Sequence, residues 1–236
     1  HTLIQRGGSI NGTDINRTSP LLWAIANRQL SVVGKLLELG ADANQTPDFW
    51  SMMDTPLIEA IRSDDIRFVE LLLEKGADPN QIGRFGTTPL IAAALDSDGN
   101  DNIVRLLLNR KANVRSTDES GHTALHYAIR ENTPNIVALL VDAGTPLDTG
   151  EVSRRSYWEA AALNGNLDIG RILIEKGIAH DEATLTTTLL TAVQANRAEF
   201  AKFLIEQGAN IDSLIESIRT HPNASIRALG KGTENQ

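Results

Sequence analysis

The chain has 236 residues, of which 41% are hydrophobic, 22% are charged and only 4% are aromatic. Its formal net charge of -8 argues against a surface for nucleic acid or anionic lipid, because both need clustered Lys and Arg. The absence of cysteine excludes disulfides, thiolate metal sites and a cysteine nucleophile. No apolar run approaches the roughly 20 residues that a membrane-spanning helix needs.

A glycine-centred phrase recurs along the chain with a nearly constant spacing. The clearest copies are Gly40-Ala41-Asp42-Ala43-Asn44, Gly76-Ala77-Asp78-Pro79-Asn80 and Gly208-Ala209-Asn210, and weaker copies centre on Gly7, Lys111, Gly144 and Gly177. The steps between these centres are 33, 36, 35, 33, 33 and 31 residues. A spacing that holds along the whole chain indicates an array of structural repeats.

A second phrase keeps the same phase and predicts the start of a helix. Its copies are Ser19-Pro20-Leu21, Thr55-Pro56-Leu57, Thr88-Pro89-Leu90 and Thr123-Ala124-Leu125-His126, with degenerate copies at Ser156-Tyr157-Trp158 and Thr187-Thr188-Leu189. A hydroxyl caps the free N–H groups of the first turn, where proline is tolerated because its missing N–H has no partner to lose.

A second helix follows each first helix, for example from Ile66 to Lys75, with Phe68, Val69, Leu72 and Leu73 on its buried face. Gly76 ends this helix, since glycine enters the left-handed conformation without a Cβ penalty. Lys111 holds the equivalent place in the third repeat. We expect a cost of roughly 1 kcal/mol if the conformation is kept there.

The two phrases together resemble the ankyrin repeat, whose signature is Thr-Pro-Leu-His-x-Ala with a period near 33 residues. The resemblance implies an all-α ankyrin-repeat solenoid of about six helix-turn-helix repeats with β-hairpin loops. We expect one domain over residues 1–236, with a partial repeat at 1–14, six repeats at 15–214, and a C-terminal cap and tail at 215–236. The partial first repeat predicts residues upstream of position 1 in the native protein, where a signal sequence or lipid anchor could lie.

Catalytic and metal-binding patterns are weak in this sequence. Only His122 and His126 have the i, i+4 spacing of a metal pair, and the resemblance assigns His126 to hydrogen bonding with the backbone. Phosphate loops and the HExxH and GxSxG motifs are absent. Residues 96–102 are similar to a calcium loop but lack its terminal Glu, so a polar surface turn is favoured. We therefore predict no enzyme activity, no metal and no cofactor.

The resemblance implies that loop tips and the first helices of the repeats line a groove that binds another protein. An expanded segment at 45–54 carries large apolar residues, which favour an interface, although Phe49 and Met53 could instead fold back over the neighbouring hairpin. The loop candidates for partner contact are Phe49, Trp50, Met52, Arg84, Phe85, Glu119, His122, Arg154, Arg155 and Tyr157. The candidates on first helices are Trp23, Glu59, Arg62, Tyr127, Arg130 and Glu131. Trp158 is expected in the core.

The leading hypothesis is a non-catalytic protein–protein interaction module that is monomeric when free. The sequence of residues 14–24 is similar to that of bacterial ankyrin proteins encoded beside secreted phospholipase toxins. Those ankyrin proteins act as immunity proteins against the toxins. This resemblance implies an inhibitor that neutralises a toxin enzyme such as a phospholipase. The alternatives are an intracellular scaffold or host-directed effector fragment, and a small-molecule-binding protein or enzyme. A periplasmic and a cytoplasmic location both stay open, as does binding by the groove or by the back of the array.

Overall fold

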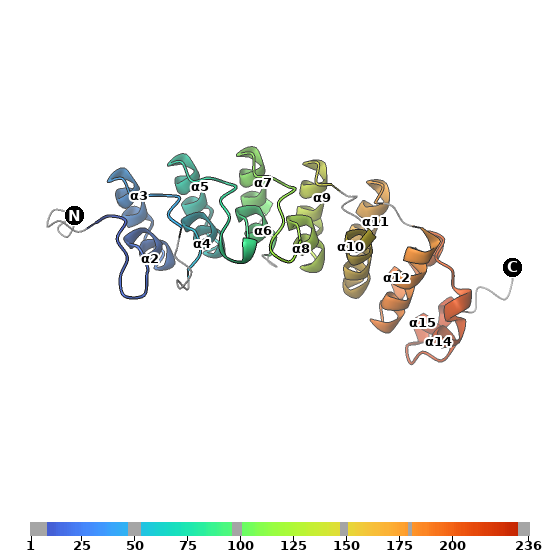
Figure 1. Ribbon diagram of the computed structural model, residues 1–236. Coiled ribbons are helices and arrows are strands. Elements are labelled where there is room, and N and C mark those ends of the chain that lie inside the picture. Colours follow the sequence, from blue (N-terminus) through green and yellow to red (C-terminus); the bar gives the residue numbers. More distant parts are fainter. Residues whose placement is uncertain (1–8, 47–52, 96–100, 147–150, 179–180, 231–236) are drawn as a thin grey trace. The chain divides into compact units, whose positions relative to one another are not determined.

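The computed structural model describes residues 9–46, 53–95, 101–146, 151–178 and 181–230, with the side chains of 151–156 left aside (Figure 1). The chain divides into two compact units, His1–Tyr127 and Ala128–Gln236, here called unit 1 and unit 2. Their boundary falls inside helix α8, which spans Ala124–Arg130. The single domain expected from the sequence stays a prediction.

Unit 1 consists of helix pairs arranged in two layers. Its elements are α2 (Pro20–Ala26), α3 (Leu30–Glu38), α4 (Pro56–Arg62), α5 (Ile66–Glu74), the 3-10 turn η1 (Arg84–Gly86), α6 (Pro89–Ala94), α7 (Asp101–Asn109) and the first part of α8. The first helices α2, α4 and α6 pack against one another in turn, and the second helices α3, α5 and α7 form the other layer (Figure 1). Because each pair is thin, its apolar face is covered by the neighbouring pair.

Unit 2 continues the same pattern with longer first helices. Its elements are the end of α8, α9 (Pro134–Asp142), α10 (Glu151–Asn164), α11 (Leu167–Glu175), α12 (Glu182–Gln194), α13 (Ala198–Glu206), the 3-10 turn η2 (Asp212–Leu214), α14 (Ile215–Arg219) and α15 (Ala224–Leu229). Here α10 packs on α12, and α9, α11 and α13 form the second layer. The short helices α14 and α15 bury Ile218 and Ile226, in the region predicted from the sequence to be a C-terminal cap.

Helix starts follow the sequence pattern where serine or threonine precedes proline. The hydroxyl of Ser19 accepts the N–H of Leu22 at 3.2 Å, and that of Thr88 accepts the N–H of Ile91 at 3.3 Å. Thr55 also precedes a proline, but its side chain makes no capping hydrogen bond. Asp54 is instead the acceptor for the N–H of Thr55.

Helix ends confirm the left-handed position inferred from the repeat. The residues directly after the C-caps of the second helices have positive φ, namely Gly40 (89°), Gly76 (89°), Lys111 (67°), Gly144 (83°), Gly177 (71°) and Gly208 (99°). Lys111 therefore adopts the conformation that glycine takes in the other repeats, as its place in the period predicts. α5 itself ends at Glu74, and Lys75 is its C-cap residue.

The asparagine of the recurring phrase links each repeat of unit 1 to the next. Its side-chain oxygen accepts a backbone N–H one repeat further on: Asn11 from Asp42 at 2.9 Å, Asn44 from Asp78 at 2.7 Å and Asn80 from Asn113 at 2.7 Å. The side-chain amide of Asn44 also donates to the carbonyl oxygen of Gly76 at 2.9 Å. These bonds fix the register between adjacent loops.

Three details differ from the sequence-based expectation. α10 begins at Glu151 and α12 at Glu182, each several residues before its degenerate start phrase at Ser156 or Thr187. Neither phrase contains a proline to set the first turn, and Asp181 caps α12 by accepting the N–H of Thr184 at 2.7 Å. In place of the expected β-hairpin loops, the described residues contain one isolated antiparallel β-bridge, between Thr117 and Thr123.

Candidate protein-binding surface

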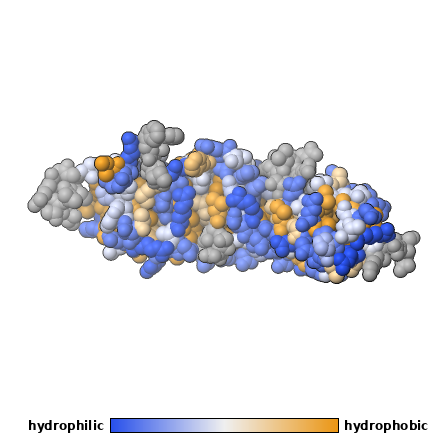
Figure 2. All heavy atoms as spheres, turned by 90° about the horizontal axis from the view of Figure 1, so that it is seen from below, coloured by the Kyte–Doolittle hydropathy of each residue, from blue (hydrophilic) through white to orange (hydrophobic). Residues whose placement is uncertain are grey.

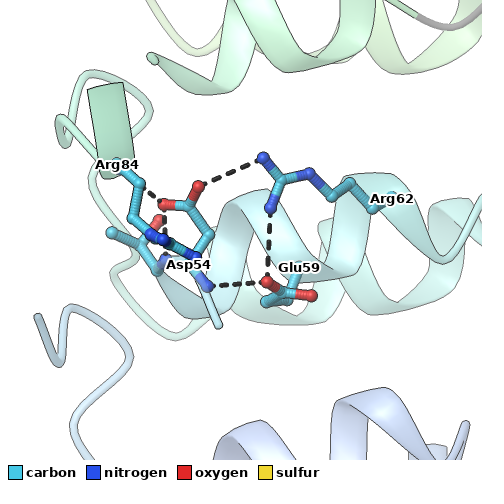
Figure 3. A network of polar contacts seen from close by, with 5 residues as sticks. Asp54, Glu59, Arg62 and Arg84 are labelled. Atoms are coloured by element: carbon cyan, nitrogen blue, oxygen red, sulfur yellow. Dashed lines mark hydrogen bonds and ion pairs between the residues drawn. The ribbon is translucent and has the colours of Figure 1, made fainter. Parts of the chain in front are cut away.

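A buried carboxylate organises the loop side of unit 1 (Figure 3). The Asp54 side chain is 1% exposed, and its Oδ1 accepts the backbone N–H of Thr55 at 2.9 Å and of Arg84 at 3.1 Å. Its Oδ2 pairs with the Arg62 guanidinium at 3.1 Å. Glu59 Oε1 accepts the Asp54 backbone N–H at 2.6 Å and pairs with Arg62 at 3.3 Å. Arg62, half exposed, is therefore held between two carboxylates.

The turn at Arg84 and Phe85 forms a tip that exposes the Phe85 ring. Phe85 has a left-handed backbone with φ 56°, yet 67% of its surface is exposed. The Arg84 guanidinium lies 5.2 Å from the centre of the Phe85 ring, and the Phe85 carbonyl accepts the N–H of Glu119 at 3.1 Å. A bulky residue in this conformation stores backbone strain of order 1–3 kcal/mol. Such strain occurs where surrounding contacts fix the backbone, and it is concentrated at functional sites.

The next loop of unit 1 is ordered by Asp118. Its carboxylate accepts the N–H groups of Ser120 and His122, both at 2.9 Å, and the hydroxyl of Tyr127. The rings of His122 and His126 stack with centres 4.0 Å apart. Partial burial works to raise the Asp118 pKa, but the hydrogen bonds from Tyr127, His122 and Ser120 outweigh it and hold the pKa below its ordinary value. The candidates Glu119, His122 and Tyr127 thus belong to one fixed loop and the helix behind it.

The remaining candidates are distributed more widely. Trp23 is half exposed on α2, and Arg130, in unit 2, pairs with its neighbour Glu131 at 3.1 Å. Phe49, Trp50 and Met52 lie outside the described residues. Arg154 and Arg155 belong to the helical backbone of α10 rather than to a loop tip, and their side chains lie outside the described part.

Tyr157 is a correction to the sequence-based list. It was expected at an exposed tip, but only 1% of its surface is accessible. Because α10 starts before it, Tyr157 lies on the buried side of a helix next to Trp158, which is a core residue as expected. Tyr157 therefore packs inside unit 2 and is not placed to contact a partner.

Sequence reasoning missed Asp54 and a shallow depression beside Arg62. The depression has a volume of about 200 Å³ and is lined by Ile61, Arg62, Asp64, Ala92 and Leu95, from the ends of α4 and α6. An acidic residue directly before Thr-Pro was a visible signal for the network, because such a carboxylate can reach the free N–H groups of the helix start. No sequence signal marks the depression, which depends on how two repeats pack.

Exposed aromatic and arginine side chains characterise this surface. Among the described residues, no three His, Asp or Glu side chains are grouped to hold a metal ion, and no helix is both long and apolar enough to cross a bilayer. The face in Figure 2 shows apolar residues as small separate patches among polar ones. Trp23, Phe85 and Arg62 are exposed and belong to the residue types that are enriched in protein interfaces.

Comparison with known proteins places these features in a family. A family model of ankyrin repeats, in three copies, matches residues 1–82 and 57–150. Ankyrin repeat domain-containing protein SAT10 of Stachybotrys chartarum is 31% identical over 112 residues, which cover 47% of this chain and 6% of that protein. Potassium channel AKT1 of Arabidopsis thaliana is 36% identical over 158 residues, covering 52% of this chain and 18% of the channel.

A bacterial relative is similar to the same degree. The putative ankyrin repeat-containing protein of Treponema pallidum is 32% identical over 117 residues, covering 48% of this chain and 39% of that protein. The chain thus spans well under half the length of these relatives. Ankyrin repeats are modules for protein–protein interaction, which agrees with the exposed side chains of Trp23, Phe85 and Arg62. The matched models, the period and the paired helices show that this chain belongs to the ankyrin-repeat family.

Proposed function

We propose that this chain is a non-catalytic module that binds another protein through unit 1. The contact residues are those of the tip, Arg84 and Phe85, together with the loop at Glu119 and His122 and the first-helix residues Trp23, Arg62 and Tyr127. These residues of unit 1 are called the tip surface below. Arg130 of unit 2 remains a separate proposed contact.

The observation that carries the proposal is the strained, exposed Phe85. The exposed Phe85 ring contributes little hydrophobic stabilisation to the free protein, and the left-handed backbone of Phe85 costs conformational energy in addition. Both costs are offset when the ring enters a pocket of a partner, because burying such a side chain is worth about 1.5–3 kcal/mol. Asp54 accepts the Arg84 N–H and Glu119 donates its N–H to the Phe85 carbonyl. These two hydrogen bonds hold the tip in place beforehand, so little entropy is lost on binding.

The partner is, in this proposal, an enzyme that the module neutralises. The support is the similarity of residues 14–24 to immunity proteins of secreted phospholipase toxins. A rigid surface of this kind inhibits by covering an active site or the face with which a lipase contacts its membrane. A scaffold or effector fragment uses the same surface without inhibiting anything, so enzyme inhibition separates the two functions.

The test of inhibition uses purified bacterial phospholipases acting on phospholipid vesicles. The chain should abolish the activity of one enzyme at equimolar concentration, and Phe85→Ala should weaken inhibition at least about tenfold. Leu163→Ala is the matched control, because Leu163 is a similarly exposed apolar residue in unit 2. Full activity of every phospholipase in the presence of the chain contradicts the inhibitor role.

The candidates outside the described side chains remain part of the proposal. Phe49, Trp50 and Met52 follow the recurring phrase directly before Asp54, and Arg154 and Arg155 lie in α10. A Trp50→Ala, Met52→Ala double variant should bind the partner more weakly than the wild type, and combining it with Phe85→Ala should weaken binding further. Equal affinity of the double variant and the wild type removes this segment from the binding surface.

A further inference from the structure

Asparagine is followed directly by glycine at two places in the chain, Asn11-Gly12 and Asn164-Gly165. The backbone nitrogen after an asparagine can attack the carbonyl carbon of the asparagine side chain, and glycine has no Cβ to hinder the approach. Both pairs therefore have the same intrinsic chemistry. The structure places them in different surroundings, which decide whether the attack takes place.

The side chain of Asn11 is held in a way that favours attack. Asn11 is exposed in a turn before α2, and its side-chain oxygen accepts the N–H of Asp42 at 2.9 Å. An N–H donor at this oxygen stabilises the negative charge that develops there when the carbonyl carbon is attacked. Within the described residues, the amide nitrogen of Asn11 donates no hydrogen bond, so nothing holds it back as a leaving group.

The attacking nitrogen at this pair is held by one long hydrogen bond. The N–H of Gly12 donates to the carbonyl oxygen of Ser9 at 3.2 Å, at the long end of the range for N–H···O bonds. This bond closes an exposed turn and is not part of a helix. Local opening therefore releases the Gly12 nitrogen at a small cost in free energy.

The second pair is held at both reacting groups. Asn164 is the last residue of α10, and its amide nitrogen donates to the carbonyl oxygens of Ile129 at 2.9 Å and Arg130 at 3.0 Å. The N–H of Gly165 donates to the carbonyl oxygen of Ala161 at 2.8 Å, which continues the helical ladder. Attack at this pair requires that three hydrogen bonds break together.

We infer that Asn11 is a site of spontaneous deamidation, and that Asn164 is protected by the fold. The Gly12 nitrogen gives its proton to hydroxide and bonds to Cγ of Asn11, and the Cγ–Nδ2 bond breaks with release of ammonia. Water then opens the resulting cyclic imide at either carbonyl and leaves aspartate or isoaspartate. One water is consumed for each ammonia released, and no group is oxidised or reduced.

The modification acts on the link between the first two repeats of unit 1. Besides the bond to Asp42, the backbone carbonyl of Asn11 accepts the side-chain amide of Gln45 at 3.0 Å. Isoaspartate lengthens the main chain by a methylene at this point and displaces that carbonyl. Both products also add a carboxylate near Asp42, which like-charge repulsion disfavours. The isoaspartate form should therefore unfold at a lower urea concentration than the unmodified chain.

The experiment incubates the full chain at mildly alkaline pH, once folded and once unfolded in guanidinium chloride. Peptide mapping by mass spectrometry, with chromatographic separation of isoaspartate, gives the conversion rate at each site. In the folded chain Asn11 should convert at least about tenfold faster than Asn164, because the groups of Asn164 are held away from attack geometry. In the unfolded chain the two rates should converge. Asn11→Gln should abolish the product at position 11, and Asn164→Gln is the matched control that should leave it unchanged.

Equal conversion of the two sites in the folded chain overturns the inference, as does faster conversion of Asn164. Conversion of Asn11 only after unfolding also overturns it, because the turn would then protect the site as well as the helix does. The isoaspartate form is separated and unfolded in urea beside the unmodified chain. An unchanged urea midpoint overturns the effect assigned to the link with Asp42 and Gln45.

Discussion

The buried carboxylate of Asp54 accepts the backbone N–H of Arg84 at 3.1 Å, across 30 residues of sequence. This bond connects the start of α4 to the tip in the following repeat (Figure 3). The same carboxylate holds Arg62, so one buried group positions two residues of the tip surface. The arrangement explains how a short loop keeps Phe85 in a strained, exposed conformation.

Asp54→Ala should destabilise the protein by roughly 1–3 kcal/mol, because the N–H groups of Thr55 and Arg84 lose their acceptor. The loss is less than for a fully buried ion pair, since Arg62 can turn toward water. Urea unfolding measures the change, and hydrogen exchange at the Arg84 amide should accelerate. Glu70→Ala, on the exposed face of α5, is the control, and an unchanged Arg84 exchange rate in Asp54→Ala contradicts the assigned bond.

Gly83→Ala should destabilise by about 1–3 kcal/mol through overpacking. A Cβ at Gly83 would lie 1.9 Å from Asp54 Oδ1 and 2.6 Å from Ile58 Cδ1, so the network must shift. Gly34→Ala in α3 is the matched control: its Cβ would meet only Leu71 at 3.8 Å, and alanine favours the helix by about 1 kcal/mol. The two melting temperatures should move in opposite directions, and equal shifts contradict the close approach at Gly83.

Lys111→Gly should stabilise the protein by about 1 kcal/mol, because glycine takes φ 67° without the Cβ penalty. Gly76→Ala should destabilise by a similar amount, since φ there is 89° and a Cβ would meet no atom within 4 Å. Both values come from urea unfolding under identical conditions. A destabilising Lys111→Gly would show that contacts of the lysine side chain outweigh the backbone strain.

The stability contribution of Asp118 should depend on pH in one direction. Its folded-state pKa lies below the ordinary value of 3.8, so it stabilises the fold above that value, and this stabilisation is lost as pH falls through the folded pKa. The difference in unfolding free energy between wild type and Asp118→Asn should be constant near neutral pH and shrink in acid. Urea unfolding over a pH series measures it. A difference that grows in acid contradicts the lowered pKa.

Much of the fold follows from local sequence signals. The period alone predicts that Lys111 occupies a left-handed position, and the structure confirms it. Ser19 and Thr88 cap helices as their place before proline predicts. In contrast, the period places Tyr157 in a loop directly before a first helix. In this repeat no proline sets the first turn, and α10 begins upstream at Glu151. Tyr157 therefore lies within the helix and is a core residue.

The candidate site was less accessible to prediction, because its key contacts are long-range. The residue types of the tip, Arg84 and Phe85, were visible in the sequence, but the strain at Phe85 and its support by Asp54 depend on the packing of two repeats. The depression at Asp64 and Leu95 likewise exists only where the ends of two helices meet.

The central claim is that a protein partner is held by the tip surface. The direct measurement is affinity capture from the native organism with immobilised wild type, Phe85→Ala and Leu163→Ala, followed by quantitative mass spectrometry. The account predicts one stoichiometric protein retained by the wild type and by Leu163→Ala, and reduced at least about tenfold on Phe85→Ala. Equal retention of that protein on Phe85→Ala, or no stoichiometric protein on the wild type, would contradict the claim.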